Sequence, residues 1–152
     1  MLKTENLFFV RPGKNGQIEL LSKNLLNVIG KNNSLSIVAR KKIKKCCLSA
    51  EIIANYFGVK HEEYEEEERF IPITGLISLL DQKMEQYTNI VLIDNQESIK
   101  KMAIYYANIL KISHKNLHKI DLLDIHGKKE IIKVKKGCAW WIKPQLSELF
   151  TF

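Results

Sequence analysis

Three short apolar runs along the chain predict buried β-strands. They cover residues 6–11, 35–39 and 90–93. The first run is closed by Pro12-Gly13, a pair of residues that favours a turn. The third run is apolar throughout, which is typical of a central strand that is covered on both faces of its sheet.

Between and after these runs, apolar residues recur at intervals of three and four, the spacing that places them on one face of a helix. Gly30 and Gly58 follow the first two of these segments, where a glycine is well suited to end a helix. Ser98 precedes the fourth and is expected to cap its N-terminus. The predicted helices cover residues 18–28, 43–57, 76–84 and 99–109.

The C-terminal third of the chain predicts further strands. Residues 119–125 and 130–135 are joined by His126-Gly127, a pattern typical of a hairpin, and residues 138–142 add a last strand. Because strands alternate with helices before this point, we expect a mostly parallel sheet between two helical layers, with the hairpin as an antiparallel edge. The predicted fold class is a three-layer α/β/α sandwich, formed by one domain that covers residues 1–152.

The length and composition are those expected of one ordinary globular domain. The chain has 152 residues, of which 45% are hydrophobic and 27% are charged. No apolar run approaches the roughly 20 residues that a membrane span requires, and residues 7–10 are too short a run for the core of a secretory signal. The three cysteines are too few for a disulfide framework, so we interpret them as reduced thiols and expect a cytoplasmic protein.

The formal net charge of +7 favours anionic partners without naming one. Residues 41–45 are mostly lysine, but they lack the interleaved aromatic residues on which nucleic-acid bases stack, so nucleic acid is not the expected partner. Binding of a polyanion by charge alone is an alternative. The acidic run of residues 62–68 is expected on the surface, as a loop or as a solvated helix face.

Three segments are predicted to follow strands at the edge of the sheet where α/β proteins bind ligands, beyond the carboxyl ends of the strands. Two of the three segments are basic, so the sequence predicts a site for a phosphate-sized anion. The segments are Arg11-Pro12-Gly13, residues 40–45 and Asp94-Asn95.

The same three segments resemble the motifs of the histidine phosphatase superfamily, most closely those of its small SixA-type phosphohistidine phosphatases. The family's first strand runs into Arg-His-Gly or Arg-His-Ala, and this chain has FFVRPG. The family's next helix start, Ser-x-x-x-Arg-Ala-x-x-Thr-Ala-Glu-Ile-Ile, corresponds to KKIKKCCLSAEIIANYFGV, and its Val-Gly-His corresponds to VLIDNQES. The resemblance extends over nearly the whole chain and implies a three-layer, phosphoglycerate mutase-like fold.

The resemblance also implies where a site would lie and what it lacks. Members of the family attack phosphate with the histidine that follows the first arginine. Here Arg11 is followed by Pro12, whose side chain has no lone pair with which to attack phosphorus. Lys45 stands where the second arginine is expected, or Lys44 does if the register differs by one residue, and Asn95 replaces the second histidine. The implied phosphate or anion site consists of Arg11, Lys45 (or Lys44) and Asn95, with no intact catalytic histidine.

We therefore expect a pseudo-phosphatase, which binds a phosphate-containing small molecule or a phosphoprotein without turning it over. One alternative is a divergent but active phosphohistidine or phosphomonoester phosphatase, in which Asp94, His114 or His118 takes over the chemistry. Another is that Arg11 is held by a carboxylate or by helix-end carbonyls and binds no ligand. His114 and His118 are spaced like two metal ligands on a helix, but no third ligand lies nearby, so neither a metal nor a cofactor is expected.

Overall fold

The computed structural model describes residues 2–30, 34–65, 74–110, 135–145 and 148–151. These residues form six strands and four helices. The strands are β1 (Asn6–Val10), β2 (Leu35–Arg40), β3 (Glu62–Tyr64), β4 (Asn89–Ile93), β5 (Ala139–Lys143) and β6 (Glu148–Thr151). The helices are α1 (Asn15–Ile29), α2 (Lys44–Phe57), α3 (Thr74–Met84) and α4 (Gln96–Leu110).

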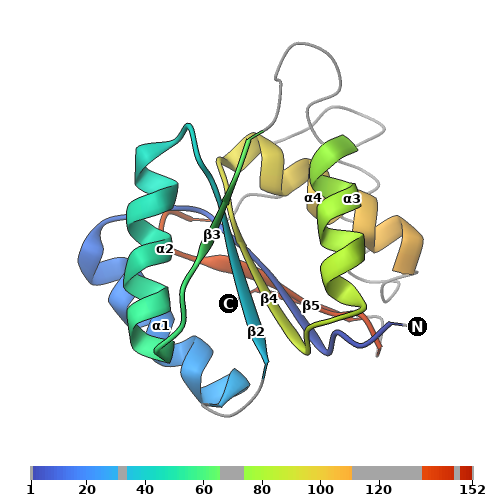
Figure 1. Cartoon of the computed structure of the whole chain (residues 1–152), viewed down its shortest axis with the longest axis horizontal. Coiled ribbons are helices and arrows are strands. Elements are labelled where there is room, and N and C mark those ends of the chain that lie inside the picture. The colour runs from blue at the N-terminus through green and yellow to red at the C-terminus, as the bar shows by residue number, and fades with distance from the viewer. Residues whose placement is uncertain (1, 31–33, 66–73, 111–134, 146–147, 152) are drawn as a thin grey trace.

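The strands form one sheet in the order β3-β2-β4-β1-β5-β6. The first four strands in this order run parallel to one another, whereas β5 is antiparallel to β1 and β6 is antiparallel to β5. Helices α1 and α2 lie on one face of the sheet, and α3 and α4 lie on the other (Figure 1). The predicted three-layer sandwich, with a mostly parallel sheet and an antiparallel edge, is confirmed.

The antiparallel edge is formed by β5 and β6. The hairpin predicted at residues 119–135 lies outside the described residues, apart from Lys135. The strand predicted at residues 138–142 is present as β5, and it pairs directly with the first strand of the chain, with Trp141 opposite Phe8. The beginning of β5 therefore lies at the same edge of the sheet as the end of β1.

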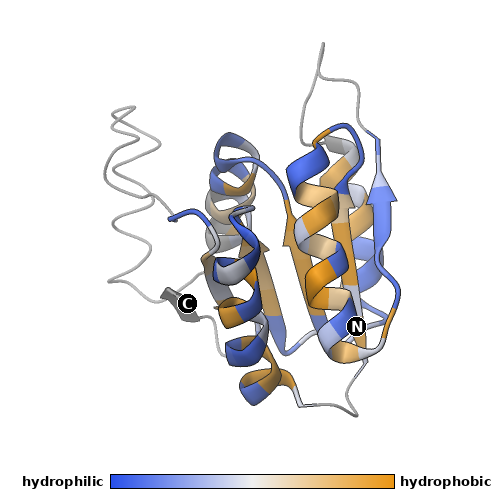
Figure 2. Cartoon of the chain, turned by 90° about the vertical axis from the view of Figure 1, so that its left-hand side faces the viewer, coloured by the Kyte–Doolittle hydropathy of each residue, from blue (hydrophilic) through white to orange (hydrophobic). Residues whose placement is uncertain are grey.

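The core is divided between the two faces of the sheet by the alternation of side chains along each strand. In β1, Phe8 and Val10 pack with α1 and α2, whereas Leu7 and Phe9 pack with α3 and α4. All five residues of β4 are buried. Figure 2 shows the apolar strands between helices whose surfaces combine apolar and polar residues. The continuous apolar runs of the sequence thus correspond to strands that are covered on both faces.

The helices follow the predicted apolar spacing, and two of them end at the predicted glycines. Gly30 and Gly58 have positive φ values of 76° and 66°, which a glycine adopts without steric cost. The predicted cap of α4 is wrong. Asn95, not Ser98, occupies the capping position, because its side-chain oxygen accepts a hydrogen bond from the Ser98 N–H at 2.8 Å. No helix among the described residues is long and apolar enough to cross a membrane.

The beginning of the acidic run forms a strand, which corrects the prediction of a loop or a helix face. Residues 62–64 make up β3, which pairs in parallel with β2 at the edge of the sheet. Glu62 and Glu63 are exposed as predicted, whereas Tyr64 is buried. The Glu62 carboxylate forms an ion pair with the ammonium group of Lys83 on α3. Glu62 and Glu63 therefore belong to the edge strand of the sheet.

The buried thiol of Cys46 makes stability sensitive to alkaline pH. Burial raises the pKa of this thiol from an ordinary value of 9.0 to about 12. Between these two values the unfolded chain has lost the proton and the folded chain retains it, so the free energy of unfolding falls as pH rises. Cys46→Ala removes this contribution. When the pH is raised from about 8 to about 10.5, the free energy of unfolding, measured by urea denaturation, should fall in both proteins. We expect this fall to be smaller in the variant than in the native protein, by up to about 2 kcal/mol. Equal losses in the two proteins would contradict this assignment.

Candidate functional site

A cavity of about 550 Å³ lies at the carboxyl ends of β1, β2 and β4. The β1–α1 connection supplies residues 11–14 to its lining, the β2–α2 connection supplies Ile43, and the first turn of α2 supplies Lys45. Asn95 precedes α4, residues 96–97 begin this helix, and the loop before β5 supplies Lys136. We call it the Arg11 cavity. Its position is the one at which open α/β sheets bind ligands.

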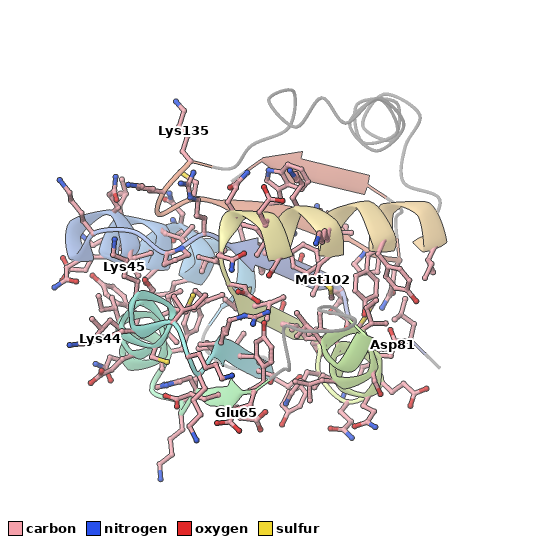
Figure 3. The ribbon with its side chains drawn as sticks, turned by 90° about the horizontal axis from the view of Figure 1, so that it is seen from above. Lys44, Lys45, Glu65, Asp81, Met102 and Lys135 are labelled. Carbon is pink, nitrogen blue, oxygen red and sulfur yellow. The ribbon has the colours of Figure 1, made fainter. Side chains whose placement is uncertain are left out.

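Three residues that the motifs imply for an anion site line this one cavity: Arg11, Lys45 and Asn95. They are far apart in the sequence, and they meet because β1, β4 and β2 are neighbouring parallel strands that end at the same edge of the sheet. Lys44, the alternative to Lys45, does not line the cavity. Figure 3 looks onto this edge and shows Lys45 on the side of α2 toward α1 and Lys44 on its outer side. Successive residues of a helix point about 100° apart, so only one of the two faces the cavity.

Positive charge dominates the described lining of the cavity. Glu97 is its acidic residue, and the Glu97 carboxylate pairs with the Lys100 ammonium at 3.2 Å. Lys14 and Lys136 do not belong to the site that the motifs imply. Lys136 could have been found from the antiparallel pairing of β5 with β1, because this pairing places the residues before β5 next to the end of β1. The basic residues of the lining are Arg11, Lys14, Lys45 and Lys136.

The end of β1 is joined to the loop before β5 by two backbone hydrogen bonds. The Arg11 N–H donates to the carbonyl of Cys138 at 3.0 Å, and the Gly137 N–H donates to the carbonyl of Arg11 at 2.9 Å. The two segments approach so closely that a Cβ atom on Gly13 would lie 2.6 Å from the amide nitrogen of Gly137. This contact holds Lys136 at the cavity.

Pro12 lines the cavity immediately after Arg11. A proline side chain carries no lone pair and its backbone nitrogen carries no hydrogen, so this position neither attacks a phosphorus atom nor donates a hydrogen bond to it. Among the described lining residues there is no histidine, cysteine, serine, threonine or tyrosine. The arrangement therefore offers cations and amides for binding, and Glu97 is its carboxylate.

Asn95 connects the cavity to the start of α4. Its side-chain oxygen caps the helix at Ser98, and its backbone N–H donates to the Asp94 carboxylate at 2.7 Å. Because the side-chain oxygen is used as a cap, the side-chain nitrogen is the group that Asn95 can offer to a ligand. This nitrogen is a neutral hydrogen-bond donor.

Arg40, the last residue of β2, and Asp94, which follows β4, form a buried ion pair. The Arg40 Nε lies 2.9 and 3.1 Å from the two Asp94 oxygens, and the residues are 2% and 0% exposed. The Tyr64 hydroxyl also donates to Asp94, and the guanidinium lies 5.4 Å from the centre of the Tyr64 ring. Burial and the Asp94 carboxylate raise the pKa of Tyr64, so the hydroxyl keeps its proton and remains a donor.

Because they form this buried ion pair, Arg40 and Asp94 do not belong to the candidate site. The sequence places Arg40 in the basic segment at the ligand-binding edge and offers Asp94 as a substitute catalytic group, but neither residue lines the Arg11 cavity. A charged side chain at the end of a strand can turn inward when a partner of opposite charge ends the neighbouring strand. His114 and His118 lie outside the described residues. Within the described ranges, no three His, Cys, Asp or Glu side chains gather as metal ligands would.

Comparison with known proteins identifies the fold. No protein-family model matches the sequence, and no curated protein matches it either. Solved structures of similar fold include the following two. A protein assigned as the phosphohistidine phosphatase SixA from Agrobacterium tumefaciens has a TM-score of 0.59 at 6% identity, over 97% of this chain and 96% of that chain. Phosphoglycerate mutase from Plasmodium falciparum has a TM-score of 0.56 at 11% identity, over 97% of this chain and 87% of that chain.

At identities of 6% and 11%, the structural similarity establishes the arrangement of helices and strands alone. The chemistry of the site has to be derived from the residues of this chain. The similarity covers almost the whole chain in both comparisons. It agrees with the resemblance that the three motif segments indicate in the sequence. This protein has a histidine phosphatase-like fold, similar to that of SixA.

Proposed function

We propose that this protein binds a phosphorylated ligand in the Arg11 cavity and does not hydrolyse it. The observation that supports this function best is a cavity at the ligand-binding edge of a histidine phosphatase-like fold that has basic residues on its walls and a proline beside its arginine. The basic residues favour a phosphate group, and the proline removes the nucleophile that the family uses.

The cations of the cavity suit a phosphate group. A guanidinium such as that of Arg11 binds two phosphate oxygens through parallel hydrogen bonds, and lysines such as Lys45 add point charges. The side-chain nitrogen of Asn95 is a third kind of donor. The cavity also receives the N-terminal ends of α1, α2 and α4, whose partial positive charges favour an anion.

The described lining is poorly suited to phosphate hydrolysis. A phosphoenzyme requires a side chain with an available lone pair at the attacking position, and Pro12 has none. Glu97 is the carboxylate of the lining, but it is exposed and paired with Lys100, and its negative charge repels a phosphate. Nucleophilic residues and their partners fail as a unit when one is lost, so the remaining cations stabilise a bound phosphate more than a transition state.

The first test measures turnover and binding in the same preparations. We expect hydrolysis of an aryl phosphate and of a phosphohistidine peptide to be no faster than with Arg11→Ala. In titration calorimetry with inorganic phosphate, Arg11→Ala is expected to weaken binding about 10-fold or more, because a charge-assisted bidentate contact is lost. Lys45→Ala should weaken binding about three- to tenfold.

Lys44→Ala is the matched control for Lys45→Ala. Both lysines are exposed and lie in the first turn of α2, but only Lys45 lines the cavity. The affinity of Lys44→Ala should stay within about twofold of the native value. Turnover that disappears in Arg11→Ala would instead identify a divergent phosphatase. Equal losses for the two lysine variants, with a steep salt dependence and no effect of Arg11→Ala, would identify a polyanion-binding protein.

A further inference from the structure

The Arg11 cavity is larger than a phosphate group. Its volume is about 550 Å³, which lies within the roughly 300–1,000 Å³ of pockets that enclose organic ligands. A phosphate held by Arg11 and Lys45 would occupy a small part of it. The remaining space must be filled by water or by the rest of the ligand.

The walls of the cavity include apolar side chains beside the cations. Pro12 follows Arg11 directly, and Ile43 precedes Lys45 by two residues. Both apolar residues are half-buried, so part of each surface is accessible. Ile43 also packs against the core between α1, α2 and the sheet, which fixes its position. Each of these two phosphate-binding cations thus has an apolar surface close to it.

These observations define the part of the ligand that lies next to its phosphate. A polyphosphate that lies against Pro12 and Ile43, and not against Lys14 or Lys136, would bring further negative charge to side chains that form no hydrogen bond with it, so this charge would lose hydration without a partner. An apolar group in the same place removes its own surface and that of the two side chains from water, which is favourable. The position of the apolar walls beside the cations therefore selects a phosphate monoester over a chain of phosphates.

We infer that the ligand is a phosphate monoester of an apolar organic group, with the phosphate at Arg11 and Lys45 and the apolar group against Pro12 and Ile43. This inference rests on the proposed function and gives its ligand a chemical class. A small molecule and a phosphorylated aromatic side chain of a protein share this chemistry.

The test compares three probes in titration calorimetry: inorganic phosphate, glycerol phosphate and phenyl phosphate. Glycerol phosphate carries a polar group and phenyl phosphate an apolar one. We expect phenyl phosphate to bind about 10-fold more tightly than glycerol phosphate. Ile43→Thr should reduce this preference to about threefold or less while leaving the affinity for inorganic phosphate within about twofold. Threonine keeps the branched shape and suits the residue that precedes a helix, so α2 is expected to form.

Two further variants support the comparison. Pro12→Ala removes apolar surface from the other wall. It should also reduce the preference for phenyl phosphate over glycerol phosphate. Leu48→Thr makes the same kind of change at an exposed apolar residue of α2 that lies outside the cavity, and it should leave the preference unchanged. If Ile43→Thr does not fold, as judged by urea denaturation, Pro12→Ala still carries the test.

The outcomes separate this inference from the function on which it rests. Phosphate binding that depends on Arg11, with equal affinities for phenyl and glycerol phosphate or with tighter binding of tripolyphosphate, would overturn the inference alone. No binding of any probe would overturn both. A peptide that contains phosphotyrosine distinguishes the two sources. If this peptide binds at least as tightly as phenyl phosphate, and if Ile43→Thr weakens its binding, the ligand is a phosphoprotein. If the peptide does not bind, while phenyl phosphate still binds more tightly than glycerol phosphate, the ligand is a small molecule.

Discussion

Arg40→Met is expected to lower the free energy of unfolding by about 3–5 kcal/mol. The substitution leaves the Asp94 carboxylate fully buried without the guanidinium that lies 2.9 Å from it in the native protein. An uncompensated charge in the interior costs much more than the ion pair itself contributes, because the charge has lost its hydration. Methionine retains much of the apolar stem of arginine and fills the space flexibly. Urea denaturation followed by tryptophan fluorescence measures the loss.

Two further variants separate the buried charge from other causes. Adding Asp94→Asn to Arg40→Met removes the unpaired charge and should recover about half of the loss or more. Lys41→Met breaks the adjacent surface ion pair with Glu65, in which the side chains are 57% and 64% exposed. Such a pair contributes less than about 1 kcal/mol. A loss in Arg40→Met no larger than that in Lys41→Met would show that the buried pair does not support the ends of β2 and β4.

Gly137→Ala is expected to lower the free energy of unfolding by about 1–3 kcal/mol and to weaken phosphate binding about two- to fivefold. Gly137 has a φ of +73°, and an added Cβ atom would lie 2.5 Å from the Cβ atom of Gln17. That atom is attached to the backbone of α1 and cannot rotate away, so the loop must move. The loop is hydrogen-bonded to Arg11 and carries Lys136, so its displacement reaches the cavity. Urea denaturation and phosphate calorimetry report the two effects.

Gly16→Ala is the matched control for this substitution. Gly16 lies in the first turn of α1, and nothing lies within 4 Å of the Cβ atom that the substitution adds. Alanine is favoured over glycine in a helix by up to about 1 kcal/mol, so stability should rise. Effects of the same sign and size at Gly16 and Gly137 would argue against a tight contact between the loop and α1.

The order of strands and helices could be predicted because the signals are local. An apolar run such as residues 90–93 reports a covered strand without knowledge of its neighbours. Gly30 and Gly58 report helix ends through their own backbone conformations. The strand β3 could not be predicted in this way. It has three residues, two of them exposed glutamates, and its regular feature is the hydrogen bonding to β2, which no local pattern reveals.

Part of the candidate site could be predicted as well. Arg11, Lys45 and Asn95 follow strands at the ligand-binding edge, and the motifs point to them. Arg40 could not be distinguished from the lysines that follow it, because the signal that buries it is the Asp94 carboxylate, 54 positions away on a neighbouring strand connection. Lys136 required knowledge that β5 pairs antiparallel with β1. Local sequence patterns therefore do not predict those residues that reach the site, or leave it, through the pairing of distant strands.

Because β1 lies between β4 and β5 in the sheet, it can be paired on both sides only after both of these strands have been synthesised. Asn6 is hydrogen-bonded to Asn89 and to Trp141, which follow it by 83 and 135 positions. At about 5–20 residues per second of synthesis, the apolar β1 waits roughly 7–27 s for β5 to emerge from the ribosome. During that time the edge of β1 that pairs with β5 lacks its partner strand. The loop before β5 forms one wall of the Arg11 cavity, so a ligand encounters the complete cavity only after this loop and β5 have been synthesised.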